Sequence, residues 1–235
     1  MSSLQDLKVF TTHPHPCSYL EAQQATTLFI DPQAEIDSEL YNALAEAGFR
    51  RSGPHIYRPH CTACNACIPA RIPVTQFQMK RRHRRIWNRN ADLTVEMVSD
   101  IGSDECFELY QHYINERHAD GDMYPPTREQ YDSFLSDDFG VTRYITFRAK
   151  ERLIAVAVID EMESGLSAVY TFYAPDQEQR SLGSYAILWQ IESARSQNLP
   201  FLYLGYWIKE CRKMQYKIEY RPLQLLINRK WLTLG

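Results

Sequence analysis

Apolar residues recur at helical spacing in two stretches of the chain. In residues 35–49 they stand three or four positions apart, Asp37 or Ser38 can cap the first turn, and Gly48 follows the last turn. Residues 104–117 repeat the same spacing. The pattern predicts an amphipathic helix in each stretch.

Strand-like runs dominate from residue 142 onward. They are rich in β-branched and aromatic residues, and Ser164 with Gly165 supplies a tight turn between two of them. The predicted strands are 93–98, 143–148, 153–161, 166–173 and 201–208, and the predicted helix is 184–196. The order strand, strand, helix, strand predicts an α/β or α+β fold, in which the helix crosses one face of a mixed sheet.

The stretch 51–73 interrupts both patterns. Its four prolines and three cysteines break helical and strand periodicity, so we expect an irregular segment there. A basic run follows, and regular patterns resume after Asp92. We therefore expect a domain boundary near Asn90, with a smaller N-terminal domain in residues 1–90 and the mixed-sheet domain in residues 91–235.

Composition and charge narrow the class of protein. An apolar content of 44% in 235 residues is enough for a sizeable core. No run approaches the roughly 18 apolar residues that span a membrane, and the first residues do not form a secretory signal, so we expect a cytoplasmic protein without a membrane partner. The net charge of −3 means that any polyanion must meet a local basic patch.

Such a patch occurs between Lys80 and Arg89. Its cations suit phosphate groups, and Trp87 could stack on a base. A solvated basic face or a connector is the alternative interpretation. The residues that we expect to bind nucleic-acid phosphates are Arg81, Arg82, Arg84 and Arg85.

A loop before the last predicted helix offers an anion site. Arg180 and Gly183 fit two positions of the R-x-x-G-x-G/A pyrophosphate loop of GCN5-related N-acetyltransferases, but Tyr185 stands where that loop needs Gly or Ala. We expect the ring to crowd a coenzyme A pyrophosphate. Alternatively, Gly183 only permits close packing of strand and helix.

The cysteines form two groups. Cys61, Cys64 and Cys67 are spaced C-x2-C-x2-C, and Cys17 could add a fourth thiolate for zinc or an iron–sulfur cluster. Buried thiols in a proline-rich segment are the alternative. The remaining two, at positions 106 and 211, are expected to be core or surface thiols, because no histidine is placed to activate them.

Rings and cations alternate between Tyr203 and Pro222. This mixture can hold a carboxylate beside a sugar–phosphate end. The alternative is a core strand whose cationic ends reach water.

Several motifs resemble those of the arginyl-tRNA–protein transferases, and more closely the bacterial branch that transfers leucine to Asp or Glu. The resemblance runs from Pro16 to Trp231. It rests on Pro16-Cys17-Ser18-Tyr19, Phe49-Arg50-Arg51-Ser52-Gly53, Tyr57-Arg58-Pro59-His60-Cys61 and Tyr203-Leu204-Gly205-Tyr206-Trp207-Ile208, with further matches at 24–29, 166–173 and 181–183.

The resemblance implies transfer of an aminoacyl group, leucyl rather than arginyl, from charged tRNA to proteins with N-terminal Asp or Glu, which marks them for N-end-rule degradation. It also implies a GCN5-related acyltransferase-like domain after an N-terminal domain. Of the thiols that eukaryotic members carry, only Cys17 and Cys67 correspond here, because Leu20 and Ala66 replace the others. We expect no metal in catalysis and no cofactor.

The chemistry of this transfer selects candidate residues. An activated ester needs a held amine, a proton acceptor and oxyanion donors. We expect Asp160 and Tyr170 to be catalytic, although Asp160 could also be a solvent-facing carboxylate at a strand end. The expected substrate-binding residues are Arg58, Tyr173, Ser181, Gly183, Tyr206, Lys217 and Arg221, and the cations among them are candidates for binding the acidic side chain.

Two functions of other classes remain open. One is an N-acetyltransferase that uses acetyl-coenzyme A, against which Tyr185 argues. The other is a non-enzymatic module that binds tRNA or metal, which would leave the acyltransferase-like half unexplained.

Overall fold

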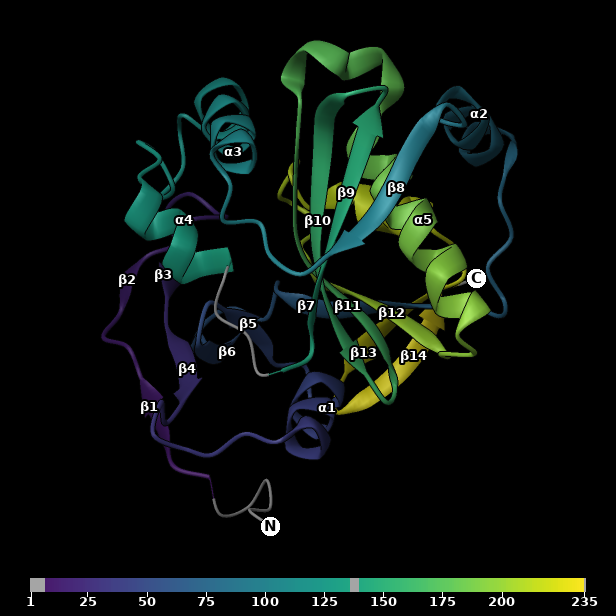
Figure 1. The fold of residues 1–235 in the computed structure, drawn as a ribbon. Helices are drawn as coiled ribbons and strands as arrows, with labels where there is room; N and C mark the ends of the chain where they lie inside the picture. The colour runs from purple at the N-terminus through teal and green to yellow at the C-terminus, as the bar shows by residue number, and fades with distance from the viewer. Residues whose placement is uncertain (1–6, 136–139, 235) are drawn as a thin grey trace.

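A large twisted sheet runs through the computed structural model, which describes residues 7–135 and 140–234, and a smaller sheet lies beside it (Figure 1). The strand order of the large sheet is β14-β13-β7-β12-β11-β10-β9-β8. Its strands are β7 (Ile68–Pro73), β8 (Leu93–Val98), β9 (Thr142–Ala149), β10 (Arg152–Met162), β11 (Gly165–Tyr173), β12 (Phe201–Trp207), β13 (Leu223–Ile227) and β14 (Lys230–Leu234).

The smaller sheet comes from the first quarter of the chain. Its order is β1-β4-β6-β5, and a short β2–β3 hairpin stands apart. These strands are β1 (Val9–Thr11), β2 (His15–Pro16), β3 (Gln24–Ala25), β4 (Thr27–Ile30), β5 (Arg50–Ser52) and β6 (His55–Pro59). The sheet shares a core with helix α1 (Ser38–Glu46), where the side chain of Asp37 accepts a hydrogen bond from the backbone N–H of Leu40 at 2.8 Å. The predicted helix and its cap are confirmed.

The second half has the predicted mixed sheet. From residue 93 onward, every predicted strand and helix occurs within two residues of its expected ends. Helix α5 (Leu182–Ser196) connects β11 to β12, which pair in parallel, whereas the other neighbouring strands of the large sheet are antiparallel. Helices α3 (Asp104–Arg117) and α4 (Arg128–Leu135) lie on the side of strands β9–β11 away from α5 (Figure 1). The mixed α/β class is confirmed.

The expectation of an irregular segment at 51–73 is wrong for most of its length, because strands β5, β6 and β7 lie within or across it. Only the stretch 60–67 and the short turn between β5 and β6 are irregular. Strand β7 tolerates two prolines because β13 pairs with it only at Ala70 and Arg71, so that at Pro69 and Pro73 it has β12 alone as a partner. The pattern also gave no sign of the β13–β14 hairpin.

The domain boundary near Asn90 stays a prediction. Strand β7 precedes it but lies in the large sheet, between β12 and β13. Helix α2 (Arg81–Arg89) also precedes it and packs on α5. Among the described residues, no helix has the length and apolar content that a membrane crossing requires.

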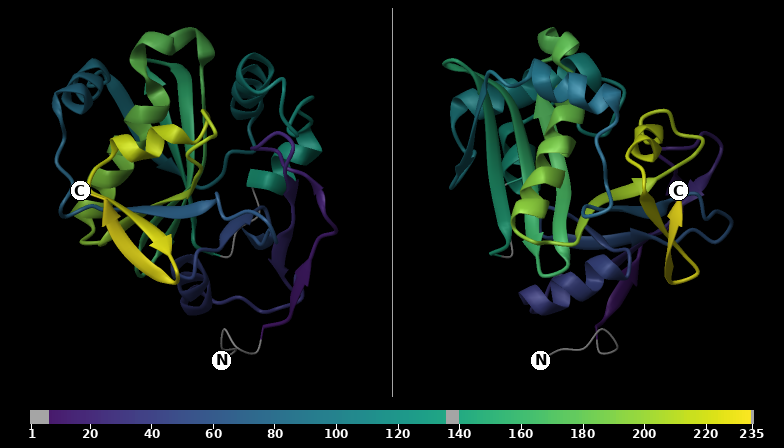
Figure 2. Two further views of the ribbon diagram at one scale, coloured as in Figure 1. Left: turned by 180° about the vertical axis from the view of Figure 1, so that it is seen from behind. Right: turned by 90° about the vertical axis from the view of Figure 1, so that its right-hand side faces the viewer.

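Strands β11 and β12 separate soon after they pair. Their register covers only residues 165–167 of β11 and 201–203 of β12. Beyond that point β12 turns away from strands β9–β11 (Figure 2). We call the region beyond Ser167 of β11 and Tyr203 of β12, where the two strands diverge, the splay. Most of the candidate site residues described next lie there.

Candidate active site

Arg50 spans the splay. It comes from β5, and its Nη1 donates a hydrogen bond to Ser167 Oγ at 2.6 Å while its Nη2 donates to the carbonyl of Ala168. On the β12 side, a Cβ built on Gly205 would lie 3.2 Å from Arg50 Nε, so the glycine makes room for the guanidinium. Sequence reasoning assigned no role to Arg50, although it stands in a motif that supports the resemblance.

Lys217 brings a second cation to this region. The residue is only 3% exposed and lies in the short 3-10 helix η2 (Gln215–Glu219), and its Nζ donates a hydrogen bond to the carbonyl of Tyr206 at 2.7 Å. Burial, followed by the nearby charge of Arg50, lowers the pKa of Lys217 to about 7. The predicted substrate-binding residue is therefore a buried amine, which can be neutral or charged near physiological pH.

Neither cation has an acidic partner among residues 7–135 and 140–234. Within the described residues, the ion pairs of the protein include neither Arg50 nor Lys217. Two partly or fully buried cations without an anion are unfavourable, because each lacks both water and a counter-charge. The site thus has the electrostatics of a receptor for a carboxylate.

Aromatic rings also lie in this region. The Tyr216 ring centroid is 5.0 Å from Lys217 Nζ, and Tyr173 packs against Tyr113 with centroids 4.8 Å apart. At the end of β12, Trp207 Nε1 is buried without a hydrogen-bond partner in the described part of the chain. Of the predicted substrate-binding residues, Lys217, Tyr173 and Tyr206 lie in this region, Tyr206 through its backbone carbonyl.

Asp160 lies elsewhere, in a closed network. The carboxylate is fully buried, and both its oxygens accept hydrogen bonds from Arg51, each at 2.7 Å. The hydroxyls of Tyr41 and Thr142 also donate to it, at 2.5 and 2.8 Å. A carboxylate that is occupied in this way has no lone pair left for a substrate proton, so we do not propose Asp160 as the base.

Other predicted residues have contacts within the protein. The Tyr206 hydroxyl donates to the carbonyl of Gly48 at 2.9 Å, and the Tyr170 hydroxyl contacts Met123 Sδ at 3.5 Å. The guanidinium carbon of Arg58 lies 4.9 Å from the Phe49 ring centroid. In Arg221, Nε donates to a backbone carbonyl at 3.3 Å. The roles predicted for these residues stay predictions.

The loop before α5 is held by the protein itself. Arg180 forms a two-pronged ion pair with Asp92 at 2.8 and 2.9 Å, and Ser181 has a left-handed backbone with a φ of 55°. A Cβ on Gly183 would lie 3.2 Å from the Tyr173 ring, which favours the close-packing interpretation of this glycine. With its arginine engaged, the loop is poorly suited to a coenzyme A pyrophosphate.

The Tyr185 ring is buried in the core, 5.5 Å from the Trp87 ring and 5.7 Å from the Phe147 ring between centroids. These contacts give the ring a packing role, and its crowding of a coenzyme A pyrophosphate stays a prediction. A side chain in the first turns of a helix can face inward, which its position in a motif does not reveal.

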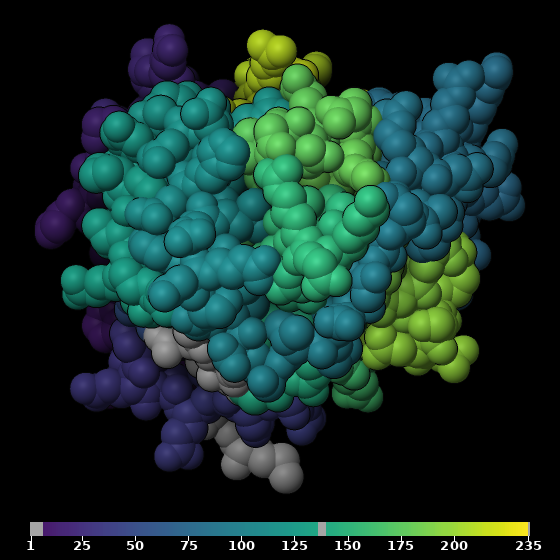
Figure 3. Space-filling view, turned by 45° about the horizontal axis from the view of Figure 1, so that its top comes forward, coloured from purple at the N-terminus to yellow at the C-terminus, as the bar shows by residue number. Residues whose placement is uncertain are grey.

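Helix α2 presents the basic patch. His83 and Ile86 are buried, and the His83 ring stacks on Tyr220 at 5.4 Å between centroids, which anchors the helix. Arg82 pairs with Glu219 on η2. The four arginines that were expected to bind tRNA, Arg81, Arg82, Arg84 and Arg85, are all exposed. This segment projects at the upper right of the molecule in Figure 3.

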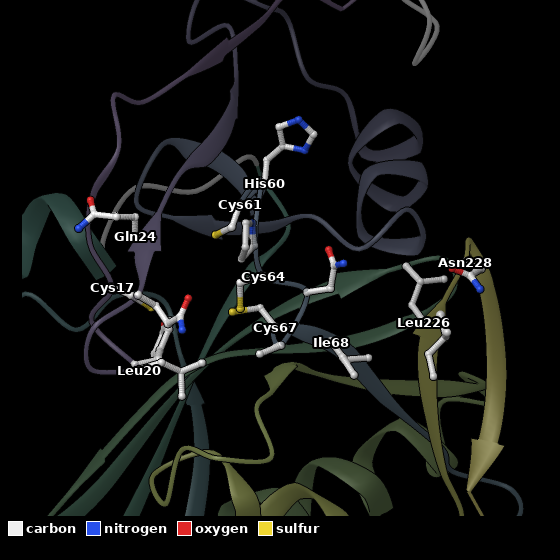
Figure 4. A pocket seen from close by; sticks show the side chains of 16 residues that line it. Cys17, Leu20, Gln24, His60, Cys61, Cys64, Cys67, Ile68, Leu226 and Asn228 are labelled. Atoms are coloured by element: carbon white, nitrogen blue, oxygen red, sulfur yellow. The ribbon is translucent and has the colours of Figure 1, made fainter.

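A pocket of about 470 Å³ gathers the four N-terminal thiols. They lie on one side of it, and Leu226 and Asn228 lie on the other (Figure 4). Burial and the neighbouring thiols raise the pKa of Cys67 to about 12. In the described part of the chain, no group of three or more Cys, His, Asp or Glu is arranged to hold a metal ion. The four converging thiols are Cys17, Cys61, Cys64 and Cys67.

The other two cysteines, Cys106 and Cys211, are buried, as expected for core thiols.

Comparison with known families gives matches in both halves. Residues 15–85 match the arginine-tRNA-protein transferase N terminus, and residues 105–227 match the C terminus of the same family. The aspartate/glutamate leucyltransferase of Pseudomonas entomophila (strain L48) is 58% identical over 235 residues, with 100% of both chains covered. The enzyme of the same name from Teredinibacter turnerae is 55% identical, covering 100% of this chain and 97% of the relative.

Solved structures offer more distant similarities. L-PGS from Bacillus licheniformis has a TM-score of 0.48 at 13% identity and covers 61% of this chain and 47% of its own. A crystal structure of FemX has a TM-score of 0.46 at 9% identity and covers 86% of this chain and 80% of its own.

Proposed function

Because the chain belongs to the arginine-tRNA–protein transferase family, we propose that it transfers leucine from leucyl-tRNA to the α-amino group of proteins that begin with Asp or Glu. The observation that carries this proposal is the full-length similarity to leucyltransferases, which includes both halves of the chain. Such an enzyme acts where charged tRNA is present. We therefore place it in the cytoplasm, where its product would enter N-end-rule degradation.

The reaction needs little chemical activation. The ester of leucyl-tRNA is already reactive, and the neutral amine of the acceptor attacks its carbonyl carbon. A C–N bond forms, the C–O bond to the terminal ribose breaks, and the proton lost by the amine passes to the ribose oxygen. The protein has to align amine and ester, accept this proton and stabilise the tetrahedral oxyanion, and none of these steps needs a covalent intermediate or a cofactor.

We place this reaction at the splay. Its support is the pair of cations that have no acidic partner among the described residues, since the acceptor carries a carboxylate beside its amine. Tyr173 and Tyr216 supply hydroxyl groups and apolar ring surface near the same place. The placement moves the proposed site from Asp160 to the region of Arg50 and Lys217.

We place the tRNA on the face formed by helix α2. Its exposed arginines can meet phosphates, and the Arg82–Glu219 pair joins this helix to the segment that carries Lys217. A tRNA bound along α2 would therefore lie beside the splay, where its charged end has to arrive.

A product assay tests the proposed function against the alternatives. The purified protein is incubated with leucyl-tRNA, arginyl-tRNA or acetyl-coenzyme A, together with peptides that begin with Asp, Glu or Ala. We expect mass spectrometry to detect leucine on the Asp and Glu peptides only. Acetylated peptides would favour the N-acetyltransferase, and binding of tRNA without any product would favour the non-enzymatic module.

A further inference from the structure

The side chain of Arg50 is held by hydrogen bonds to β11, and it forms no ion pair with an acid in the part of the chain that the structure describes. Ser167 and Ala168 of β11 accept hydrogen bonds from its two terminal nitrogens. A guanidinium has five N–H donors, so these two contacts orient the group and leave donors over. The result is a pre-oriented cation at the place where β11 and β12 separate.

The neighbouring residue Arg51 shows that an arginine in strand β5 can have an acidic partner. Arg51 lies next in the same strand and forms a buried two-pronged ion pair with Asp160. Side chains of consecutive strand residues point to opposite faces, so one arginine faces the protein network and the other faces the splay. Among the described residues, Arg51 therefore has an acidic partner and Arg50 has none.

Lys217 adds a second positive charge near Arg50 when its amine is protonated. The charge of Arg50 acts on this buried amine, which has a backbone carbonyl and the Met214 sulfur as its neighbours, at 2.7 and 3.1 Å. Two cations in this position repel each other unless an anion lies between or beside them. A bound carboxylate would remove the repulsion and use the free donors of the guanidinium.

We propose that Arg50 is a specificity-determining residue that binds the side-chain carboxylate of an N-terminal Asp or Glu, with Lys217 as the second cation facing that carboxylate. This inference rests on the proposed function. It assigns to Arg50 a role that neither sequence motifs nor relatives' names assign. Ser167 is then a positioning residue, because it holds the guanidinium and does not touch the substrate.

The test compares acids with their amides. Peptides that begin with Asp and Asn, or Glu and Gln, differ in side-chain charge but hardly in shape. The measured quantity is the ratio of kcat/KM for the acid to kcat/KM for the amide, with leucyl-tRNA as the donor. For Arg50→Gln we expect this ratio to fall by about 10- to 100-fold, because a hydrogen bond to a charged group is lost.

Two further variants make the experiment decisive. Arg50→Lys keeps the positive charge but lacks the paired N–H donors of the guanidinium, and we expect it to retain part of the preference for the acid. Arg143→Gln removes an arginine that pairs with Glu161 at the surface, and we expect it to keep the wild-type ratio. The KM for leucyl-tRNA should stay unchanged in all three variants.

The outcomes separate the two proposals. A damaged fold would lower kcat/KM for acid and amide together, so an unchanged ratio in Arg50→Gln overturns the assignment of Arg50, whether or not activity falls. If the wild-type protein transfers leucine to neither peptide, the proposed function fails first.

Discussion

Two arginines that are adjacent in the chain have opposite surroundings. Arg51 lies in a fully occupied network with Asp160, Tyr41 and Thr142, which joins the small sheet to β9 and β10. Arg50 lies in the splay, where the described residues offer it a hydroxyl and a carbonyl but no carboxylate. The difference indicates that the charge of Arg51 stabilises the fold, whereas the charge of Arg50 is available for a ligand.

The largest expected effect comes from breaking the occupied network. Asp160→Asn leaves the buried Arg51 without its counter-charge, and removing one partner of a buried ion pair costs about 3 to 5 kcal/mol of unfolding free energy. Urea unfolding, followed by circular dichroism, measures this loss. Arg50→Gln is the comparison, and we expect a loss of about 1 kcal/mol. Equal losses in the two variants would contradict the distinction between the arginines.

The second effect concerns substrate affinity. Lys217→Met preserves the volume of the side chain and removes its charge, and we expect the KM for an Asp peptide to rise by about 10- to 100-fold. The dissociation constant for tRNA should change little. If tRNA and peptide affinities fall together, Lys217 contributes to tRNA binding or to folding instead.

The contrast between the arginines was only partly readable from sequence. Apolar periodicity predicted α3 with its full extent, because the spacing of apolar residues is a local signal. Local signals do not identify Asp160 as the partner of Arg51, since the two stand 109 residues apart. The same limit led sequence reasoning to choose Lys217 for its charge without detecting its burial.

Strand β7 illustrates the limit for the fold. Its prolines indicate an irregular segment unless the neighbouring strand is known to end beside them. Arg50 could have been noticed from sequence, because two adjacent arginines in a strand must face different environments. Deciding which of the two arginines pairs with an acid still requires the positions of the acidic residues in the folded protein.

The third effect extends the comparison to the surface. On α2, Arg82 has an acidic partner in Glu219, whereas Arg81, Arg84 and Arg85 form no ion pair among the described residues. Changing all four to Gln should weaken tRNA binding and reduce the slope of log affinity against log salt by about 3. Arg82→Gln alone should change it least. Fluorescence anisotropy over a salt series measures the slope, and an unchanged slope would make α2 a solvated face.

The fourth effect is a dependence of stability on pH. Burial, Arg50 and, in the opposite direction, Cys211 set the pKa of Lys217 to about 7 in the folded protein, against 10.5 for an ordinary lysine. Between these values the unfolded chain holds a proton that the folded protein lacks, so Lys217 makes stability rise with pH across this window. Below about pH 7 both states are protonated and the contribution is constant.

The variant Lys217→Met isolates this contribution, because other titrating groups cancel in the difference between the two proteins. Urea midpoints at about pH 6.5 and about pH 9 should differ more, in the upward direction, for the wild type than for the variant. Parallel pH dependences would mean that Lys217 stays charged in the folded protein.

The smallest expected effect concerns the thiol pocket and any metal that its cysteines bind. Cys17, Cys61, Cys64 and Cys67 converge there on the N-terminal half, and Cys67 has a raised pKa that disfavours its thiolate. The transfer step needs no Lewis acid, since the ester is activated already. Any metal bound by these thiols would therefore stabilise the N-terminal segment and not take part in the reaction.

Treatment with a chelator should accordingly leave kcat unchanged in protein that stays folded, while the thermal midpoint falls if a metal was present. Elemental analysis before and after treatment establishes the metal content, and circular dichroism establishes that the fold is kept. Cys61→Ser offers a second measurement that removes one thiol without a chelator. Loss of turnover together with loss of one equivalent of zinc or iron, at unchanged circular dichroism, would contradict this prediction. It would place the chemistry at the thiol pocket as well as at the splay.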